Sequence, residues 1–262
     1  MSEGRERYLI ESLEKLVLDW MIDNGVTHEE YRAATDLVIA SVQQGELSLL
    51  FDILFEAQAT DNGNKTKPGS PEAIEGPFYI EGAPMLTEPY VLPQRADEAG
   101  DVAFMVGRVT DSAGNGLAGI EMDLWHADVD GKYSNIYPEV PAFNLRGRFL
   151  SGADGRYEVQ TILPPPYEIP KDGPTGQMLK LLGRHCFRPA HYHIKLRGDG
   201  YKELTSQLYF KDGEYLDNDV ANAVRDGLII PVTTEVRNGK ECWIAAYDFA
   251  MARVDELASA GA

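Results

Sequence analysis

Apolar residues recur every three to four positions through the first part of the chain, which predicts a helical N-terminal region. The first run, from Glu6 to about Asn24, places its leucines and its tryptophan on one helical face. Gly25 ends this run. Thr27 then begins a capping-box pattern with Glu30, which opens a second amphipathic helix toward Gln44.

A third helical run, residues 48–59, precedes a segment rich in helix-breaking residues, and we place a domain boundary there. The sequence thus divides into a helical unit, residues 1–72, and a second domain, residues 73–262. The helical unit is small and its exposed faces are apolar. We therefore expect it to pack on the rest of the chain or on a second subunit.

From about residue 100 the period changes from that of a helix to that of a strand. Short alternating runs such as FMVGRV, IEMDLWHA and RYEVQTI are separated by turn sequences rich in glycine and aspartate. Only residues 173–183 interrupt them with a helical pattern. We predict a mainly β protein, an antiparallel β-sandwich preceded by an α-helical N-terminal part.

Composition removes several classes of function. The 262 residues carry a formal charge of -18, which repels nucleic acids and anionic membrane surfaces. Two cysteines are too few for a disulfide framework, and the N-terminus lacks the apolar run of a signal peptide. No stretch approaches the roughly 18 apolar residues of a membrane helix. We expect a cytoplasmic enzyme or binding protein without nucleic-acid or membrane partners.

Two of the five histidines stand one residue apart in RPAHYHIKLRGDGY. On a strand, His191 and His193 share one face while Tyr192 and Ile194 take the other. The preceding Arg188-Pro189 favours an extended backbone. Two imidazoles on one strand face indicate a metal site, but they are equally compatible with a wet polar sheet face.

The residues that would complete such a site are less clear from local pattern. A zinc site would want a third His or a Cys, and no pattern forces Cys186 into that role. A cupin-type site would want a carboxylate soon after the second His, where residues 195–198 offer none. Tyr133 and Tyr167 lie at turns or strand ends among glycines and prolines. As phenolates they would suit a hard trivalent cation, and as phenols they would be packing residues.

Three motifs in order carry a resemblance to a known family. LWHADVDGKYS, LPPPYEIPKDGPTG and RPAHYHIKLRGDGYKELTSQLYF are similar to those of the intradiol ring-cleaving catechol dioxygenases. The similarity covers nearly the whole chain, including the helical start and the segment AIEGPFYIEGAP. The match of three ordered motifs is far more specific than the two histidines alone.

The resemblance implies one Fe(III) per subunit, with no nicotinamide, flavin or heme. It implies four metal ligands, Tyr133, Tyr167, His191 and His193. It also implies that Arg188 and Gln207 lie beside the substrate, and that Tyr167, Arg188 and Gln207 take part in catalysis. The remaining histidines His126 and His185 are expected to be hydrogen-bonded structural residues, and the turn at 128–131 is not expected to bind calcium.

The same resemblance implies the substrate and the assembly. A catechol, unsubstituted or bearing chloro or methyl groups, would be cleaved by O2 between its hydroxylated carbons to a cis,cis-muconate. A homodimer would form through the N-terminal helices, with a lipid in an apolar tunnel at the junction. The expected substrate-pocket wall consists of Leu49, Asp52, Ile53, Ile74, Gly76, Phe78, Tyr79 and Ala221.

Two alternatives remain open from the sequence. One is a hydroxyquinol-cleaving member of the same family. The other, from a different class, is a β-sandwich module that binds an aromatic ligand without catalysis.

Overall fold

The computed structural model describes residues 3–256 of the chain. Contacts within the chain divide it into two compact units, Met1–Leu47 and Ser48–Ala262. This division falls earlier than the boundary predicted after residue 72, and it assigns the third helical run, residues 48–59, to the unit that contains the strands.

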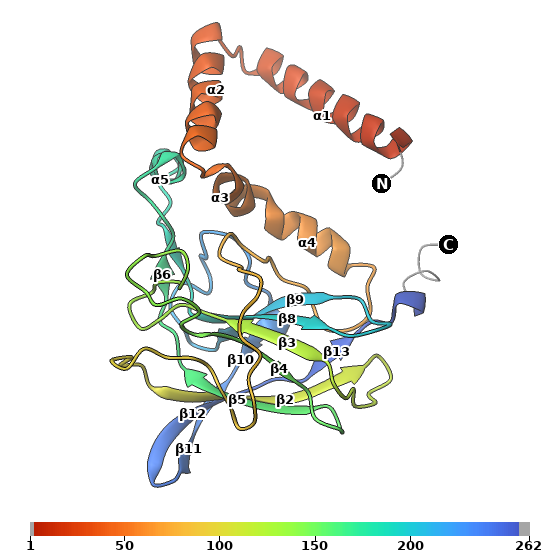
Figure 1. The fold of residues 1–262 in the computed structure, drawn as a ribbon. Helices are drawn as coiled ribbons and strands as arrows, with labels where there is room; N and C mark the ends of the chain where they lie inside the picture. The colour runs from red at the N-terminus through yellow and green to blue at the C-terminus, as the bar shows by residue number, and fades with distance from the viewer. Residues whose placement is uncertain (1–2, 257–262) are drawn as a thin grey trace. The chain divides into compact units, whose positions relative to one another are not determined.

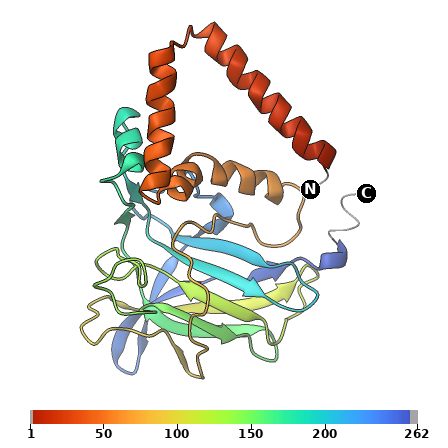
Figure 2. The same ribbon diagram turned by 45° about the horizontal axis from the view of Figure 1, so that its top comes forward.

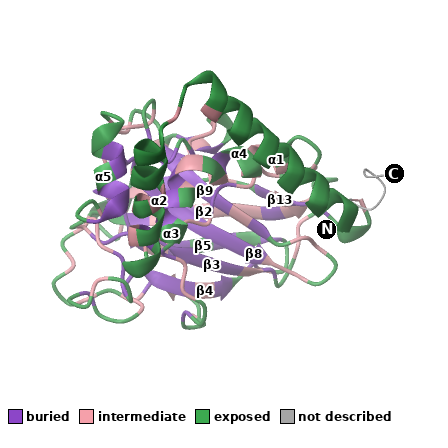
Figure 3. Ribbon diagram, turned by 90° about the horizontal axis from the view of Figure 1, so that it is seen from above, coloured by how far each residue is buried: buried purple, intermediate pink, exposed green. Residues whose placement is uncertain are grey.

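The N-terminal unit contains two helices, α1 (Glu3–Asp23) and α2 (His28–Gln43). The predicted capping box is confirmed, because the Glu30 amide donates to Thr27 Oγ1 at 3.3 Å and the Thr27 amide donates to the Glu30 carboxylate at 2.9 Å. No residue of α1 is buried, and its leucines and Trp20 are exposed (Figure 3). This unit leaves its apolar faces uncovered.

The second unit begins with a continuous helical run that changes its pitch. An α-helical turn passes into a π-helical turn and then returns to α-helix, while a separate helix and a short 3₁₀ turn occur later. The segments are α3 (Leu47–Phe51), the π turn η1 (Asp52–Glu56), α4 (Ala57–Asn64), α5 (Pro174–Leu181) and η2 (Asp226–Leu228). Within residues 3–256, no helix has both the length and the apolar character needed to cross a bilayer.

Two stacked sheets form the body of the second unit (Figure 1). The five-stranded sheet has the order β10 (Ile229–Ile230), β9 (Leu204–Phe210), β8 (His191–Arg197), β3 (Glu121–Trp125) and β4 (Arg146–Leu150). The six-stranded sheet has the order β1 (Tyr90–Val91), β5 (Arg156–Ile162), β2 (Val102–Asp111), β12 (Lys240–Ala246) and β11 (Val232–Arg237), with β13 (Phe249–Met251) also on β2. A small ribbon pairs β6 (Tyr167–Glu168) with β7 (Phe187–Arg188).

The β-sandwich is confirmed, but its sheets are mixed and not purely antiparallel as predicted. Strand β12 runs parallel to β2, and β1 and β10 run parallel to β5 and β9. Alternation along a strand reports which face is buried and not the direction of its neighbour. Parallel strands cannot be joined by a tight hairpin turn, so no turn pattern in the sequence predicts which of these strands pair.

The hydrophobic core lies between the two sheets. Met105 and Val159 from the six-stranded sheet contribute to it, as do Tyr192, Ile194 and Leu208 from the five-stranded sheet, all of them buried. The alternate residues of β8 therefore point to the opposite face of the five-stranded sheet. Helix α4 runs across that face, over β8 and β9 (Figures 1 and 2).

Candidate metal centre and active site

The two histidines of β8 meet on the covered face of the five-stranded sheet. Nε2 of His191 lies 2.9 Å from Nε2 of His193, and both side chains are buried. Nδ1 of His191 contacts the carbonyl oxygen of Pro189 at 2.7 Å, which holds the proton on Nδ1. The Nε2 lone pair of His191 is therefore the one available to a cation.

Two tyrosines from separate loops complete an aromatic cluster around these imidazoles. Tyr133 lies in the loop after β3, and Tyr167 is the first residue of β6. The ring centres of the two tyrosines are 5.2 Å apart. The ring centre of Tyr133 lies 6.0 Å from that of His193, and the ring centre of Tyr167 lies 5.6 Å from that of His191. The structure thus brings together all four residues that the family resemblance implied as ligands.

The loop that carries Tyr133 is shaped by the predicted turn. The Asp128 carboxylate accepts the amide protons of Asp130 and Lys132 at 3.0 and 2.9 Å. Gly131 adopts φ +78, and a Cβ at this position would lie 2.9 Å from Cβ of Tyr167. Only glycine satisfies both conditions, so the turn allows the Tyr133 loop to close against Tyr167.

Burial keeps all four of these groups uncharged in the protein alone. Burial lowers the pKa of His191 to about 3 and also lowers the pKa of His193 well below its usual value. Burial also raises the pKa of Tyr133 and of Tyr167. The hydroxyl of Tyr133 is buried without a well-formed hydrogen bond among the described residues, although it lies close enough to Tyr167 for the two groups to interact. A buried phenol oxygen without a well-formed hydrogen bond, on a ring packed near Tyr167 and His193, fits a bound cation.

The chemistry of the donors distinguishes among metals. Within residues 3–256, no three or more His, Cys, Asp or Glu side chains are grouped to hold an ion. Two phenol oxygens and two imidazole nitrogens instead suit a hard ion such as ferric iron. The donor set therefore fits the iron that the family resemblance implies.

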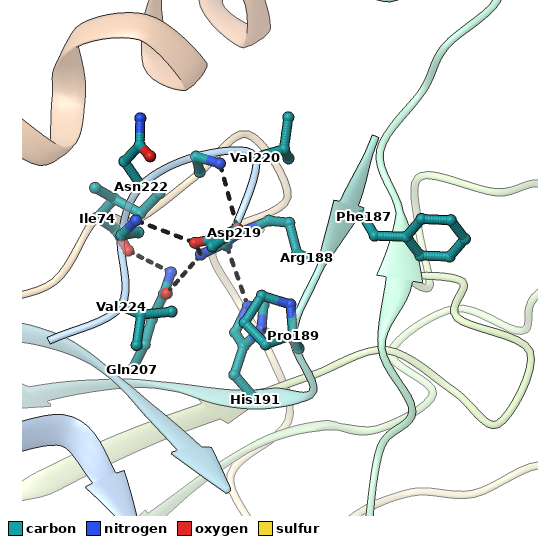
Figure 4. Close-up of polar contacts among 12 residues, drawn as sticks. Ile74, Phe187, Arg188, Pro189, His191, Gln207, Asp219, Val220, Asn222 and Val224 are labelled. Carbon is teal, nitrogen blue, oxygen red and sulfur yellow. Dashed lines mark hydrogen bonds and ion pairs between the residues drawn. The ribbon is translucent and has the colours of Figure 1, made fainter. Parts of the chain in front are cut away.

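Arg188 lies beside the imidazoles and is buried. Its Nη1 is 3.2 Å from Nε2 of His191, and its Nη2 donates to Gln207 Oε1 at 3.0 Å (Figure 4). Nη2 also donates to Tyr209 Oη at 2.9 Å. The Gln207 amide nitrogen donates to the Ile74 carbonyl at 2.8 Å. Arg188 and Gln207 thus lie next to the cluster, as expected, and Tyr209 joins them.

Asp219 is a buried member of this site that sequence reasoning missed. Its carboxylate accepts from Nε and Nη2 of Arg188, both at 3.1 Å. Burial opposes the ionisation of Asp219, but the adjacent guanidinium brings its pKa below the usual value. The only signal in the sequence was an aspartate before turn residues in DNDVANAV, a pattern that turns share widely.

A small enclosed cavity opens onto the cluster from the helical run and the segment after it. All the predicted wall residues except Tyr79 line it, together with Tyr167, Arg188 and His193. The π turn supplies Asp52 and Ile53, and α3 supplies Leu49. The extra residue of the π turn rotates these side chains toward the cavity, as π turns do at many functional sites.

Tyr79 lies elsewhere, which corrects its predicted place in the wall. Its hydroxyl donates to Asp123 at 3.0 Å and accepts from Arg197 at 2.8 Å, and its ring packs on Trp125. Trp125 in turn stacks on His193, with ring centres 4.8 Å apart and planes 13° apart. Tyr79 therefore lies behind the imidazole of His193, with Trp125 between the two rings, and does not line the cavity.

His126 and His185 are hydrogen-bonded structural residues, as predicted. His126 contacts Thr161 Oγ1 at 2.6 Å through Nε2 and the Ala127 carbonyl at 2.7 Å through Nδ1. His185 accepts the amide proton of Phe187 at 3.0 Å. Neither contributes to the aromatic cluster.

A larger, open hollow lies on the outer face of the six-stranded sheet, along β1, β2 and β5. Its lining includes none of the four clustered tyrosines and histidines. Opposite charges are mixed along it, for example Arg156 beside Glu158. Size alone does not identify a reactive site, so we assign function to the smaller cavity.

Comparisons with known proteins identify the family of the chain. A family model described as Dioxygenase matches residues 74–253. The chain is 39% identical to a chlorocatechol 1,2-dioxygenase of Rhodococcus opacus, covering 95% of this chain and 98% of that protein. It is 34% identical to a 6-chlorohydroxyquinol 1,2-dioxygenase of Cupriavidus pinatubonensis, covering 86% of this chain and 84% of that protein. The crystal structure of a 3-chlorocatechol 1,2-dioxygenase from Rhodococcus opacus superposes with a TM-score of 0.91 at 36% identity, covering 97% of this chain and 100% of that one. The chain belongs to the intradiol ring-cleaving dioxygenase family.

Proposed function

We propose that this protein cleaves catechol, or catechols bearing chloro or methyl groups, between the two hydroxylated carbons, with O2 as the oxidant and a cis,cis-muconate as the product. One ferric iron per subunit would be held by Tyr133, Tyr167, His191 and His193. The observation that carries the proposal is the convergence of two buried phenols and two neutral imidazoles in one cluster, of which Tyr167 and His193 line an enclosed cavity.

The chemistry that the metal supplies when bound is chelation of the diol and activation of its ring toward O2. The protein's own side chains do the rest. Tyr167 lines the cavity, and as a deprotonated ligand of the iron its Oη would take up one of the protons that a catechol loses on chelation. Arg188 is a permanent buried cation at the cavity and would stabilise negative charge on the reacting ring. The apolar wall, including Ile53, Ile74 and Phe78, excludes water.

The test is the visible spectrum and iron content of the purified protein, before and after anaerobic addition of catechol. We expect a broad band from tyrosinate-to-iron charge transfer that shifts when catechol binds. A protein that remains colourless after ferric reconstitution, yet still binds an aromatic ligand, would support the non-catalytic binding module instead.

Among possible ring substituents, chlorocatechols receive support from the relatives, and hydroxyquinol is less favoured. Ile53 is bulkier than the small side chain that we would expect beside a chloro substituent, so we expect catechol itself also to be cleaved. Steady-state turnover of catechol, 4-chlorocatechol, 4-methylcatechol and hydroxyquinol decides this. A kcat/KM highest for hydroxyquinol would assign the protein to that branch.

We also propose a homodimer formed through the N-terminal helices, with a lipid chain in the hollow between α1 and α2. The hollow is lined by apolar side chains that include Val17, Trp20 and Val38. Light scattering should give twice the monomer mass. The Leu16→Glu substitution at an exposed position of α1 should lower the measured mass, whereas Glu14→Gln should not.

Solvent extraction followed by mass spectrometry would reveal the lipid. A dimerisation role for residues 1–72 and a cytoplasmic location stay predictions.

A further inference from the structure

Asp219 contacts both a charged side chain and a wall of the substrate cavity. Its Oδ1 accepts from Arg188 Nε at 3.1 Å and from the Ala221 amide at 3.2 Å. Its Oδ2 accepts from Arg188 Nη2 at 3.1 Å and from the Ala223 amide at 3.0 Å. Figure 4 shows Asp219 between Arg188 and the loop that continues through Asn222 and Val224. One buried carboxylate thus orients the guanidinium and the turn that carries Ala221.

Both parts that Asp219 holds line the cavity, because Arg188 and Ala221 are among its wall residues. The loop bends back at Asn222, whose amide donates to the Asp219 carbonyl at 2.9 Å. The amide of Val220 also donates to the carbonyl of Phe187, the residue before Arg188. The loop and the strand end that carries Arg188 are therefore connected directly.

We propose that Asp219 is a positioning residue of the reaction, which sets the place of Arg188 and of the Ala221 wall together. This inference rests on the proposed function. Since both are hydrogen-bonded to the same carboxylate, a change at Asp219 alters both the rate of cleavage and the discrimination among ring substituents.

The most informative substitution is Asp219→Asn, because all four contacts of the carboxylate come from N–H donors. The amide NH2 must then face one guanidinium nitrogen and one backbone amide, whichever way the side chain turns. We expect kcat per bound iron to fall by about 10²-fold as Arg188 shifts. The ratio of kcat/KM for 4-chlorocatechol over catechol should change by about 10-fold as the Ala221 wall shifts.

The matched control is Asp217→Asn, an exposed position of the same loop, which should leave both quantities unchanged. Asp219→Glu is the second variant, because it keeps a negative charge beside the buried Arg188 and displaces it by one methylene. If Asp219→Asn does not fold, Asp219→Glu alone decides, and the same two changes are expected in it.

A purely structural role predicts another pattern. Fewer molecules would then carry iron, while kcat per iron, KM and the substrate ratio would equal those of the wild type. That result in both variants would overturn the proposal. The iron content and visible band of the wild type, measured first, keep the outcomes distinct. A colourless, inactive wild type rejects the proposed function, whereas an active wild type with unaffected Asp219 variants rejects only the role of Asp219.

Discussion

The two faces of strand β8 are equally buried and yet differ completely in chemistry. Toward the six-stranded sheet, Tyr192 and Ile194 join an apolar core. Toward the helical run, His191, His193 and Lys195 are as deeply buried but polar. Burying polar groups costs free energy, and packing contacts do not offset this cost. A protein face that is both polar and covered is therefore evidence of a site, and burial alone would not have separated it from the core.

The same comparison explains how the fold serves the reaction. The core face makes the sheet rigid, and the site face uses this rigidity to hold four donors and Arg188 in place. The contacts that hold Arg188 come from Gln207 on β9 and from the loop at Asp219. Substitutions on the two faces of β8 should consequently affect different observables.

The largest effect is expected on the site face. His193→Gln removes a proposed iron ligand, so iron content should fall and kcat should drop by more than about 10²-fold, because even supporting partners of a ligand cost that much. Iron assay and the visible spectrum check this. A coloured, iron-loaded His193→Gln protein would show that the metal is bound by other residues.

The adjacent residue on the core face should behave in the opposite way. Ile194→Ala leaves a cavity between the sheets and should lower the free energy of unfolding by about 2–5 kcal/mol. Iron per folded molecule should stay the same. Urea denaturation followed by fluorescence, with an iron assay on the folded fraction, measures both. Loss of iron without loss of stability would mean that the two faces are not independent.

A polar bridge between the sheets should make stability depend on pH. His126 follows β3 and contacts Thr161 on β5, and burial lowers its pKa to about 4. Between pH 6.5 and 4 the unfolded chain binds a proton there that the folded protein does not. Stability should therefore fall as the pH decreases through this window, by about 3 kcal/mol.

Comparison of urea unfolding between pH 8 and pH 4 for the wild type and His126→Gln isolates this contribution. The variant should lose the share of the pH dependence that belongs to His126. Parallel pH profiles for the two proteins would show that His126 does not titrate differently on folding.

The smallest effect concerns the ion pair that joins α4 to the loop carrying Ala221. Arg225 donates to the two carboxylate oxygens of Asp61 at 2.5 and 2.7 Å, but both side chains are about one-third exposed. Solvent screening should hold their coupling to about 0.5–1 kcal/mol in a double-mutant cycle of Asp61→Asn and Arg225→Gln. A coupling above about 2 kcal/mol would mean that this pair, and not Asp219, dominates the placement of the loop.

Local patterns in the sequence determined a large part of this protein. The helix period, the capping box at Thr27 and the alternation around His191 depend on residues within a few positions of one another, so each could be read directly. The pairing of His191 with His193 on one face follows from the pleat of any strand. The ordered motifs around Tyr133 and Tyr167 then identified the family.

Contacts between residues far apart in the chain were decided only by the tertiary structure. Nothing local shows that Asp219 meets Arg188 across 31 positions, or that Trp125 stacks on His193. The parallel pairing of β12 with β2, and the turning of Tyr79 away from the cavity, likewise depend on which elements pack together. A residue's neighbours along the chain constrain its backbone, whereas its partners in space depend on the whole fold. For this reason the clustering of the four candidate ligands could be predicted, and the side chains that position them could not.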